Sequence, residues 1–250
     1  YAGEVCYVDS TNGNDLISNG DIDNPFLTLD RAFRAVYNGH SIGLKPGHYA
    51  NSGGTYDKGF SIFSTKGVDS AFINITLTLE STSGGMVGFH DITIDLISML
   101  TIGFDSVLVE NTIMGHDSIS FYTGIQTDSD LIVRDSEITG INGIAFMYKR
   151  LTLSNSRIHH VPHENNYYNT ISFSGEELYM YNTTIDSNNV GVEIWGSNVA
   201  HIEQMEVRDN DIYNIFGTLA PAVGISGYYH DDINLSIEGL QVIGNTGGGL

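Results

Sequence analysis

Basic residues and cysteine are both scarce in this chain of 250 residues. Only 10 Lys and Arg accompany 30 Asp and Glu, which gives a formal net charge of −20. Such a chain is expected to bind neither nucleic acid nor anionic membranes, because no counterions would be released on binding. Cys6 is the single cysteine, so an intramolecular disulfide is excluded, and its apolar neighbours predict a small buried side chain. No apolar run is long enough to be inserted across a bilayer.

Proline and tryptophan are also rare, with four and one copies, whereas glycine occurs 29 times. Charged residues make up 16% of the chain, so its polar character comes mostly from Asn, Ser, Thr and Gly, the residues of turns. The hydrophobic fraction of 41% is enough for a continuous core. This composition favours a protein of strands and turns over a helical one.

A short pattern recurs from residue 107 onward: apolar, any, apolar, any, Asn-like, any, any, apolar. Clear copies lie at 107–114, 131–138, 151–158 and 178–185, and weaker copies at 200–207 and 235–242. Every apolar position of the pattern is filled by an apolar residue in all of these copies. Alternation with a period of two predicts short strands with one buried face. The Asn-like position suits a sharp corner, because Asn and Asp tolerate left-handed backbone geometry. Its members are Asn111, Asp135, Asn155 and Asn182.

A second element, a small residue followed by apolar-any-apolar, precedes each later copy and occurs at 124–127, 143–146, 170–173, 191–194 and 222–225. The connection from this element to the next copy is short, whereas the connection from each copy to the following element varies in length. An antiparallel sandwich would not confine length changes to one connection. The sequence therefore predicts an all-β fold, a right-handed parallel β-helix in which each coil contributes three short strands.

Fixed and variable turns combined with an asparagine corner resemble the pectin-lyase-like superfamily of right-handed β-helices, and residues 7–36 and 41–49 resemble its N-terminal segment and first coil. The resemblance implies that Asn111, Asp135, Asn155 and Asn182 stack as an asparagine ladder. From the residues themselves, Thr28 is a plausible N-cap of a short capping α-helix with an apolar stripe from Leu29 to Val36. We expect residues 1–40 to form the N-terminal strand and capping helix, and residues 41–250 one continuous β-helix with an uncapped C-terminal end. Residues 50–106 contain strand-like segments whose register the pattern does not fix.

The resemblance also implies a glycan lying across the outward face of the second element, where the contact candidates are Trp195, Gln126 and Asp128. Asp128 and Glu193 are three coils apart, about 14 Å, which exceeds the separation that glycoside hydrolysis needs. His160, in the stretch His159-His160-Val-Pro-His163-Glu164, and Glu193 are the candidate catalytic residues, with a solvated polar loop as the alternative for the histidines. Calcium is the one cofactor considered, with Asp128, Asp130, Asp209 and Asp211 as candidate ligands and plain acidic turn residues as the alternative.

Asn74, Asn182 and Asn234 head N-x-Ser/Thr sequons and are the candidate N-glycosylation sites of an extracellular or cell-surface protein. Because no complete catalytic constellation is visible, the favoured function is a non-catalytic structural or adhesion module. It would be a rigid rod that self-associates, or binds another extracellular subunit, through the ends of the β-helix. The alternative is a polysaccharide lyase or glycoside hydrolase acting on an extracellular glycan.

Overall fold

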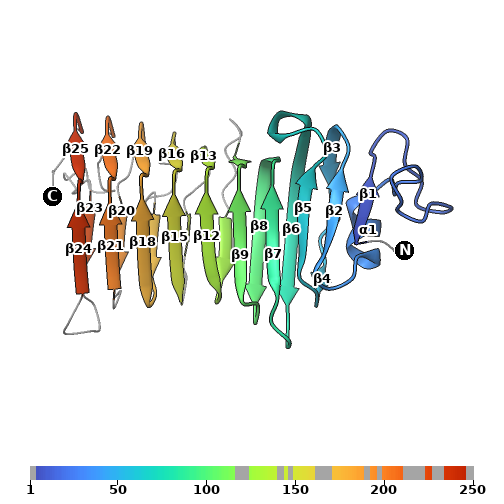
Figure 1. Cartoon of the computed structure of the whole chain (residues 1–250), viewed down its shortest axis with the longest axis horizontal. Helices are drawn as coiled ribbons and strands as arrows, with labels where there is room; N and C mark the ends of the chain where they lie inside the picture. The colour runs from blue at the N-terminus through green and yellow to red at the C-terminus, as the bar shows by residue number, and fades with distance from the viewer. Residues whose placement is uncertain are drawn as a thin grey trace.

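The computed structural model describes residues 4–115, 124–139, 144–145, 149–160, 171–188, 192–195, 199–210, 223–226 and 234–245. These residues form a parallel β-solenoid whose coils are stacked along the long axis in sequence order (Figure 1). All strand pairs outside isolated bridges are parallel in the described part of the chain. The predicted parallel β-helix is confirmed, and an antiparallel sandwich is excluded.

The first of the three sheets, sheet 1, contains ten strands among the described residues. In spatial order they are β1 (Val5–Val8), β2 (His40–Leu44), β5 (Phe60–Ser64), β7 (Met86–His90), β9 (Ser106–Glu110), β12 (Asp130–Arg134), β15 (Arg150–Ser154), β18 (Glu177–Tyr181), β21 (Val199–Glu203) and β24 (Asn234–Glu238). Equivalent positions of the repeat are register partners, as in the series Val107, Leu131, Leu151, Leu178, Ala200 and Leu235. The first triplet of each repeat copy therefore forms sheet 1.

The last apolar position of each copy lies in sheet 2, which has eleven strands among the described residues. Along its main path these are β3 (Gly47–Ala50), β6 (Ala71–Glu80), β8 (Thr93–Ile102), β10 (Ile113–Met114), β13 (Glu137–Thr139), β16 (Arg157–His159), β19 (Thr184–Asp186), β22 (Glu206–Arg208) and β25 (Gln241–Ile243), while β4 (Thr55–Tyr56) pairs with β6 and β11 (Gly124–Thr127) with β8. Sheet 3 holds β14 (Ile144–Ala145), β17 (Ile171–Ser174), β20 (Val192–Trp195) and β23 (Val223–Ser226). The second sequence element thus supplies β11 and sheet 3.

Two long strands explain why the register of residues 50–106 could not be assigned from the repeat. The strands β6 and β8 each run for ten residues without interruption. The first half of β8 pairs with β10, whereas its second half pairs with β11. In later coils the equivalent strands are separate elements joined by the connection of variable length. The coils that contain β6 and β8 have no connection at this point, so the sequence spacing that marks the later repeats is missing there.

The short helix α1 (Leu29–Ala35) lies at the N-terminal end of the stack (Figure 1). Thr28 is its N-cap, and the Thr28 hydroxyl accepts a hydrogen bond of 3.2 Å from the Arg31 N–H. Leu29, Ala32 and Phe33 are buried and cover the first coils, as predicted. Phe33 contacts Phe60 with ring centroids 5.2 Å apart. A single 3-10 turn, η1 (Val68–Ser70), precedes β6.

The core runs the length of the solenoid and consists of the inward side chains of the strands. In sheet 1 the two inward residues of each apolar-any-apolar triplet are fully buried from β9 through β21. Because one coil cannot shield its own inner face, each coil is stabilised by its neighbours on both sides. Cys6 belongs to this core and has no exposed surface, as predicted. Within the described residues, no helix has the length and apolar character needed to cross a membrane.

Candidate functional site

The corner between sheets 1 and 2 is built from residues in the left-handed backbone region. Asp91, Asn111, Asp135, Asn155, Asn182 and Gln204 have φ values between 45° and 54°. The four residues predicted as a ladder are therefore brought to equivalent places in successive coils. Their side chains are exposed, and hydrogen bonds link neighbouring coils: the Asn155 amide donates to Asp135 Oδ1 (3.1 Å), and the Asn182 amide donates to Asn155 Oδ1 (3.0 Å). Asn111 donates to Asp91 in the same way.

Directly after each corner residue, a second column of side chains points into the core. Thr112, Ser136, Ser156 and Thr183 are buried. The Thr112 N–H donates to Ser136 Oγ, and the Ser136 N–H donates to Ser156 Oγ, each at 3.2 Å. These hydroxyls satisfy backbone N–H groups that would otherwise be buried without a partner. The sequence interpretation missed this column, although a Ser or Thr follows the corner residue in all four clear copies.

A third column forms an inward asparagine ladder at the far end of sheet 2. Asn188, Asn210 and Asn245 each follow the last apolar residue of a repeat copy by three positions. Asn210 Oδ1 accepts from the Asn188 N–H (2.9 Å) and from the Asn188 amide (3.0 Å). The Asn210 N–H and amide donate to Asn245 Oδ1 at 3.0 and 2.8 Å. This column is separate from the ladder that the resemblance implies at Asn111, Asp135, Asn155 and Asn182, and it was not predicted.

An open groove of about 540 Å³ follows the exposed corner across four coils. Its polar lining includes Asn111, Asp135, Asn155 and Asn182 together with the outward residues Glu137, Arg157 and Thr184 of sheet 2. The register of β13, β16 and β19 places Glu137, Arg157 and Thr184 side by side. The groove is therefore a polar surface with the repeat of the strands, which suits an extended ligand rather than a compact one.

A cluster of charged residues borders this groove on the outer face of sheet 2. Arg157 donates two hydrogen bonds to the Asp186 carboxylate, of 2.8 and 2.7 Å. The Asp186 side chain is only 5% exposed. These bonds, with help from Arg208 and His159, hold the pKa of Asp186 below its usual value and raise the pKa of Arg157. Asp186 is thus an ionised, paired carboxylate at neutral pH.

The two neighbouring histidines of the predicted catalytic stretch belong to the same cluster. His159 Nε2 lies 2.6 Å from Glu137 Oε1, and its Nδ1 contacts Nδ1 of His160. His159 is buried, whereas His160, directly after β16 at the far end of sheet 2, is exposed and has φ of 51°. His163 and Glu164 lie outside the described residues. A carboxylate next to an imidazole can orient it as a proton acceptor.

Asp186 does not have the character of the acid in a glycosidase pair. Such a pair needs one carboxyl group whose pKa is raised so that it can act as an acid. The hydrogen bonds from Arg157 instead lower the pKa of Asp186. Among the described residues, no three His, Cys, Asp or Glu side chains converge on a position for a metal ion.

The predicted glycan contacts Gln126 and Trp195 and the candidate catalytic residue Glu193 lie on strands whose backbone is described. Glu193 on β20 pairs with Ser172 and Gly224, and Trp195 pairs with Ser174 and Ser226. Gln126 on β11 is the register partner of Leu100. The side chains of Glu193, Trp195 and Gln126 are not described, so no contact between them is assigned.

The acidic residues considered as calcium ligands have other partners where they are described. Asp128 accepts hydrogen bonds from the Gly103 N–H at 3.0 and 3.2 Å, and Asp130 lies 3.3 Å from Arg150. Asp209 follows β22 at the far end of sheet 2 and has φ of 52°, and Asp211 is outside the described residues.

The three sequons are found in different surroundings. Asn74 on β6 and Asn234 on β24 are exposed. Asn182 is a corner residue whose amide is already hydrogen-bonded to Asn155. Asn74 and Asn234 are consequently the more accessible acceptors.

No protein-family model, curated protein or solved structure matches this chain. The parallel β-solenoid is established by strand pairing and register within the chain itself.

Proposed function

We propose that this protein is a non-catalytic extracellular module, a rigid rod of the pectin-lyase-like type that serves in structure or adhesion. One observation carries the proposal: four described arginine–carboxylate pairs on the outside of the rod join side chains of different coils. Arg134 lies 2.6 Å from Glu110, and Arg150 lies 2.7 Å from Glu177. Both pairs join register partners of adjacent strands. Ion pairs with this arrangement link neighbouring coils.

The pairing also argues against acid–base catalysis at these positions. The Arg134 guanidinium holds the pKa of Glu110 below its usual value, as Arg157 does for Asp186. A general acid at neutral pH needs the opposite shift. Each exposed pair contributes only about 0–1 kcal/mol, so the pairs act mainly by repetition along the rod. Together with the buried ladders they favour a stiff, passive scaffold.

Self-association through the ends of the rod is supported by apolar side chains at both ends of the described stack. Leu16 and Ile17 are 94% and 85% exposed in the loop that connects β1 to α1. This loop is held in shape, because Asn14 Oδ1 accepts from the Leu16 N–H (2.9 Å) and Asp15 Oδ1 from the Leu27 N–H (2.7 Å). On the outermost described coil, Leu235, Ile237 and Ile243 are 43%, 41% and 52% exposed. Another copy, another subunit or a further coil would bury such surfaces favourably.

A polysaccharide lyase or glycoside hydrolase is the second candidate. The polar groove along the corner and the Glu137–His159 contact favour it, since an extended glycan fits a groove that repeats with the strands. A lyase would also need a basic residue free to take a proton. Arg157, which lines the groove, is engaged by the Asp186 carboxylate, and Arg134, on β12, by that of Glu110.

The two candidates are separated by assaying neutral and acidic glycans for unsaturated products and for new reducing ends. We expect no turnover, and sedimentation that reveals chains of copies at high protein concentration. Turnover that His160→Ala or Glu193→Gln abolishes would establish the enzyme and refute the scaffold. Lys149→Ala is the matched surface control. A stable inert monomer at every concentration would refute the assembly.

A further inference from the structure

Two histidine rings meet directly after β16, at the far end of sheet 2. Nδ1 of His159 lies 2.5 Å from Nδ1 of His160, and the ring centroids are 4.8 Å apart. We propose that this histidine pair, His159 and His160, binds a divalent transition-metal ion such as Zn²⁺ through the two Nδ1 atoms. The proposed scaffold role does not use the pair, so the inference is independent of that role.

The backbone brings the two rings together. In a regular strand, consecutive side chains point to opposite faces, so neighbouring histidines do not meet. His160 has φ of 51°, outside the strand region, and its ring lies against that of His159. Ser187 and Asp209 occupy the same position in the next two coils and have φ of 56° and 52°. The left-handed geometry therefore belongs to this position of the coil, and the histidine pair places two imidazoles on it.

Glu137 prepares His159 to act as a ligand. Its Oε1 lies 2.6 Å from Nε2 of His159. This partner assigns the Nε2–H of the neutral ring to the carboxylate, which leaves a lone pair on Nδ1. Histidines that bind metals usually have such a carboxylate or a carbonyl on the other ring nitrogen, where it fixes the tautomer and raises the basicity of the ligand. The nitrogen of His159 that faces His160 is thus an acceptor.

Two facing ring nitrogens need a positive group between them, because two unprotonated nitrogens would repel each other at this distance. A proton on Nδ1 of His160 satisfies the pair, and a metal ion can replace that proton. Zn–N bonds of about 2.0–2.1 Å at a tetrahedral angle put the two nitrogens roughly 3.3 Å apart. The rings would therefore have to separate by less than about 1 Å. His160 is exposed, which permits this shift.

The ligand set selects the class of ion. Imidazole suits Zn²⁺, Cu²⁺ and Ni²⁺, whereas Ca²⁺ and Mg²⁺ prefer oxygen ligands. The described part of the chain brings no third His, Cys, Asp or Glu side chain to the pair, so water has to complete the coordination shell. The net charge of −20 favours the approach of any cation, but only a metal ion that prefers nitrogen gains from two imidazoles.

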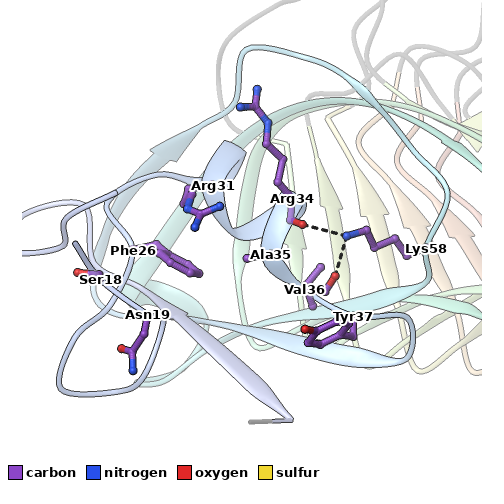
Figure 2. A pocket seen from close by; sticks show the side chains of 9 residues that line it. All are labelled: Ser18, Asn19, Phe26, Arg31, Arg34, Ala35, Val36, Tyr37 and Lys58. Atoms are coloured by element: carbon purple, nitrogen blue, oxygen red, sulfur yellow. Dashed lines mark hydrogen bonds between the residues drawn. The ribbon is translucent and has the colours of Figure 1, made fainter. Parts of the chain in front are cut away.

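The pocket beside the capping helix is the contrasting case (Figure 2). It has a volume of about 470 Å³, and its lining includes Arg31, Arg34 and Lys58. Lys58 Nζ donates to the carbonyls of Arg34 (3.1 Å) and Val36 (2.8 Å) at the end of α1. Cations in the lining would repel a metal ion, so this pocket does not compete with the histidine pair.

The test is a calorimetric titration of the whole chain with Zn²⁺ near neutral pH, with Ca²⁺ as the ion that prefers oxygen. His160→Asn should raise the Zn²⁺ dissociation constant about tenfold or more, because one of two protein ligands is lost. Asn tolerates the left-handed backbone, so this variant retains the turn. Glu137→Gln should weaken binding about tenfold, although both imidazoles remain. His48→Asn, which removes an exposed imidazole of β3, should change the constant less than about twofold.

Thermal unfolding is the second measurement. Zn²⁺ that binds only the folded chain should raise the Tm of the wild type and of His48→Asn, and should raise that of His160→Asn much less. Absence of saturable Zn²⁺ binding to the wild type would overturn the proposal. Equal affinity in His160→Asn would overturn it too, because the ion would then be bound by surface carboxylates. Equally tight binding of Ca²⁺ that depends on His160 would overturn coordination by imidazole.

Discussion

The buried asparagine ladder provides the sharpest test of how this rod is stabilised. Replacing Asn210 by Leu retains the approximate volume of the side chain but removes all of its polar atoms. The Asn188 N–H then loses its acceptor in a buried site, and the Ile185 carbonyl loses the donor that now lies 3.1 Å away. A buried backbone group left without its partner costs about 1–3 kcal/mol. We expect Asn210→Leu to lower the free energy of unfolding by about 2–4 kcal/mol.

The exposed corner is the internal comparison, because its asparagines act through backbone geometry. Asn155 has φ of 49° and an exposed side chain. Asn155→Leu should cost about 1–3 kcal/mol, mainly because Leu is strained in the left-handed region. Asn155→Gly should restore most of that loss, since glycine adopts this conformation freely. Asn210→Gly should be no more stable than Asn210→Leu, because both variants lack the hydrogen-bonding atoms of the asparagine side chain.

Urea denaturation followed by circular dichroism measures all four variants, and thermal unfolding provides a second measurement. For a chain of this size, the loss at Asn210 corresponds to a decrease in Tm of roughly 5–15 °C. A loss below about 1 kcal/mol for Asn210→Leu would refute the claim that the buried ladder satisfies otherwise unpaired groups. Equal damage by Asn155→Gly and Asn155→Leu would refute the geometric account of the corner.

Four further outcomes are expected. The pKa of Asp186 is lowered in the folded state, so its pairing with Arg157 stabilises the protein at pH values above the ordinary Asp pKa of about 3.9. This stabilisation is lost as the pH falls below that value. Asp186→Asn should therefore flatten the pH dependence of Tm between about pH 4 and 2. The melting temperature should rise with NaCl concentration, because salt screens the self-repulsion of a chain with a net charge of −20. Identical melting curves in EDTA, Mg²⁺ and Ca²⁺ would exclude a structural calcium ion, whereas a rise in Tm with Ca²⁺ alone would establish one. Burial raises the pKa of the Cys6 thiol to about 12, so a thiol reagent at pH 8 should label the protein only after unfolding, and rapid labelling of the native state would contradict its burial. In a glycosylating host, mass spectrometry should find Asn234 more occupied than Asn182, and the reverse would contradict the corner position of Asn182.

The repeat alone was sufficient to predict the β-helix. Alternating apolar residues specify strands with one buried face, and the Asn-like position specifies a left-handed corner, which Asn155 and its equivalents adopt. The capping helix was also predictable, because an N-cap such as Thr28 and an apolar stripe are local features. Residues 50–106 escaped assignment because β6 and β8 continue through the point at which later coils are interrupted.

Columns of polar residues depended instead on the tertiary stack. Nothing local decides whether Asn210 points inward, since that depends on an acceptor and a donor supplied by the coils on either side. The fixed offset of Asn188, Asn210 and Asn245 from the repeat is visible in the sequence. That these side chains point inward and bond to one another follows only from the stacking of the coils.

Contacts between distant residues were decided by the fold in the same way. Arg157 and Asp186 are 29 residues apart in sequence, and Glu137 and His159 are 22 apart, with connections of varying length between them. Lys58 likewise reaches the end of α1 from 22 residues beyond Val36. Sequence determined which side chains each coil carries and which strand holds them, because strand periodicity is local. Which charges meet on the outer face was decided by coil stacking, because register between coils is a property of the whole chain.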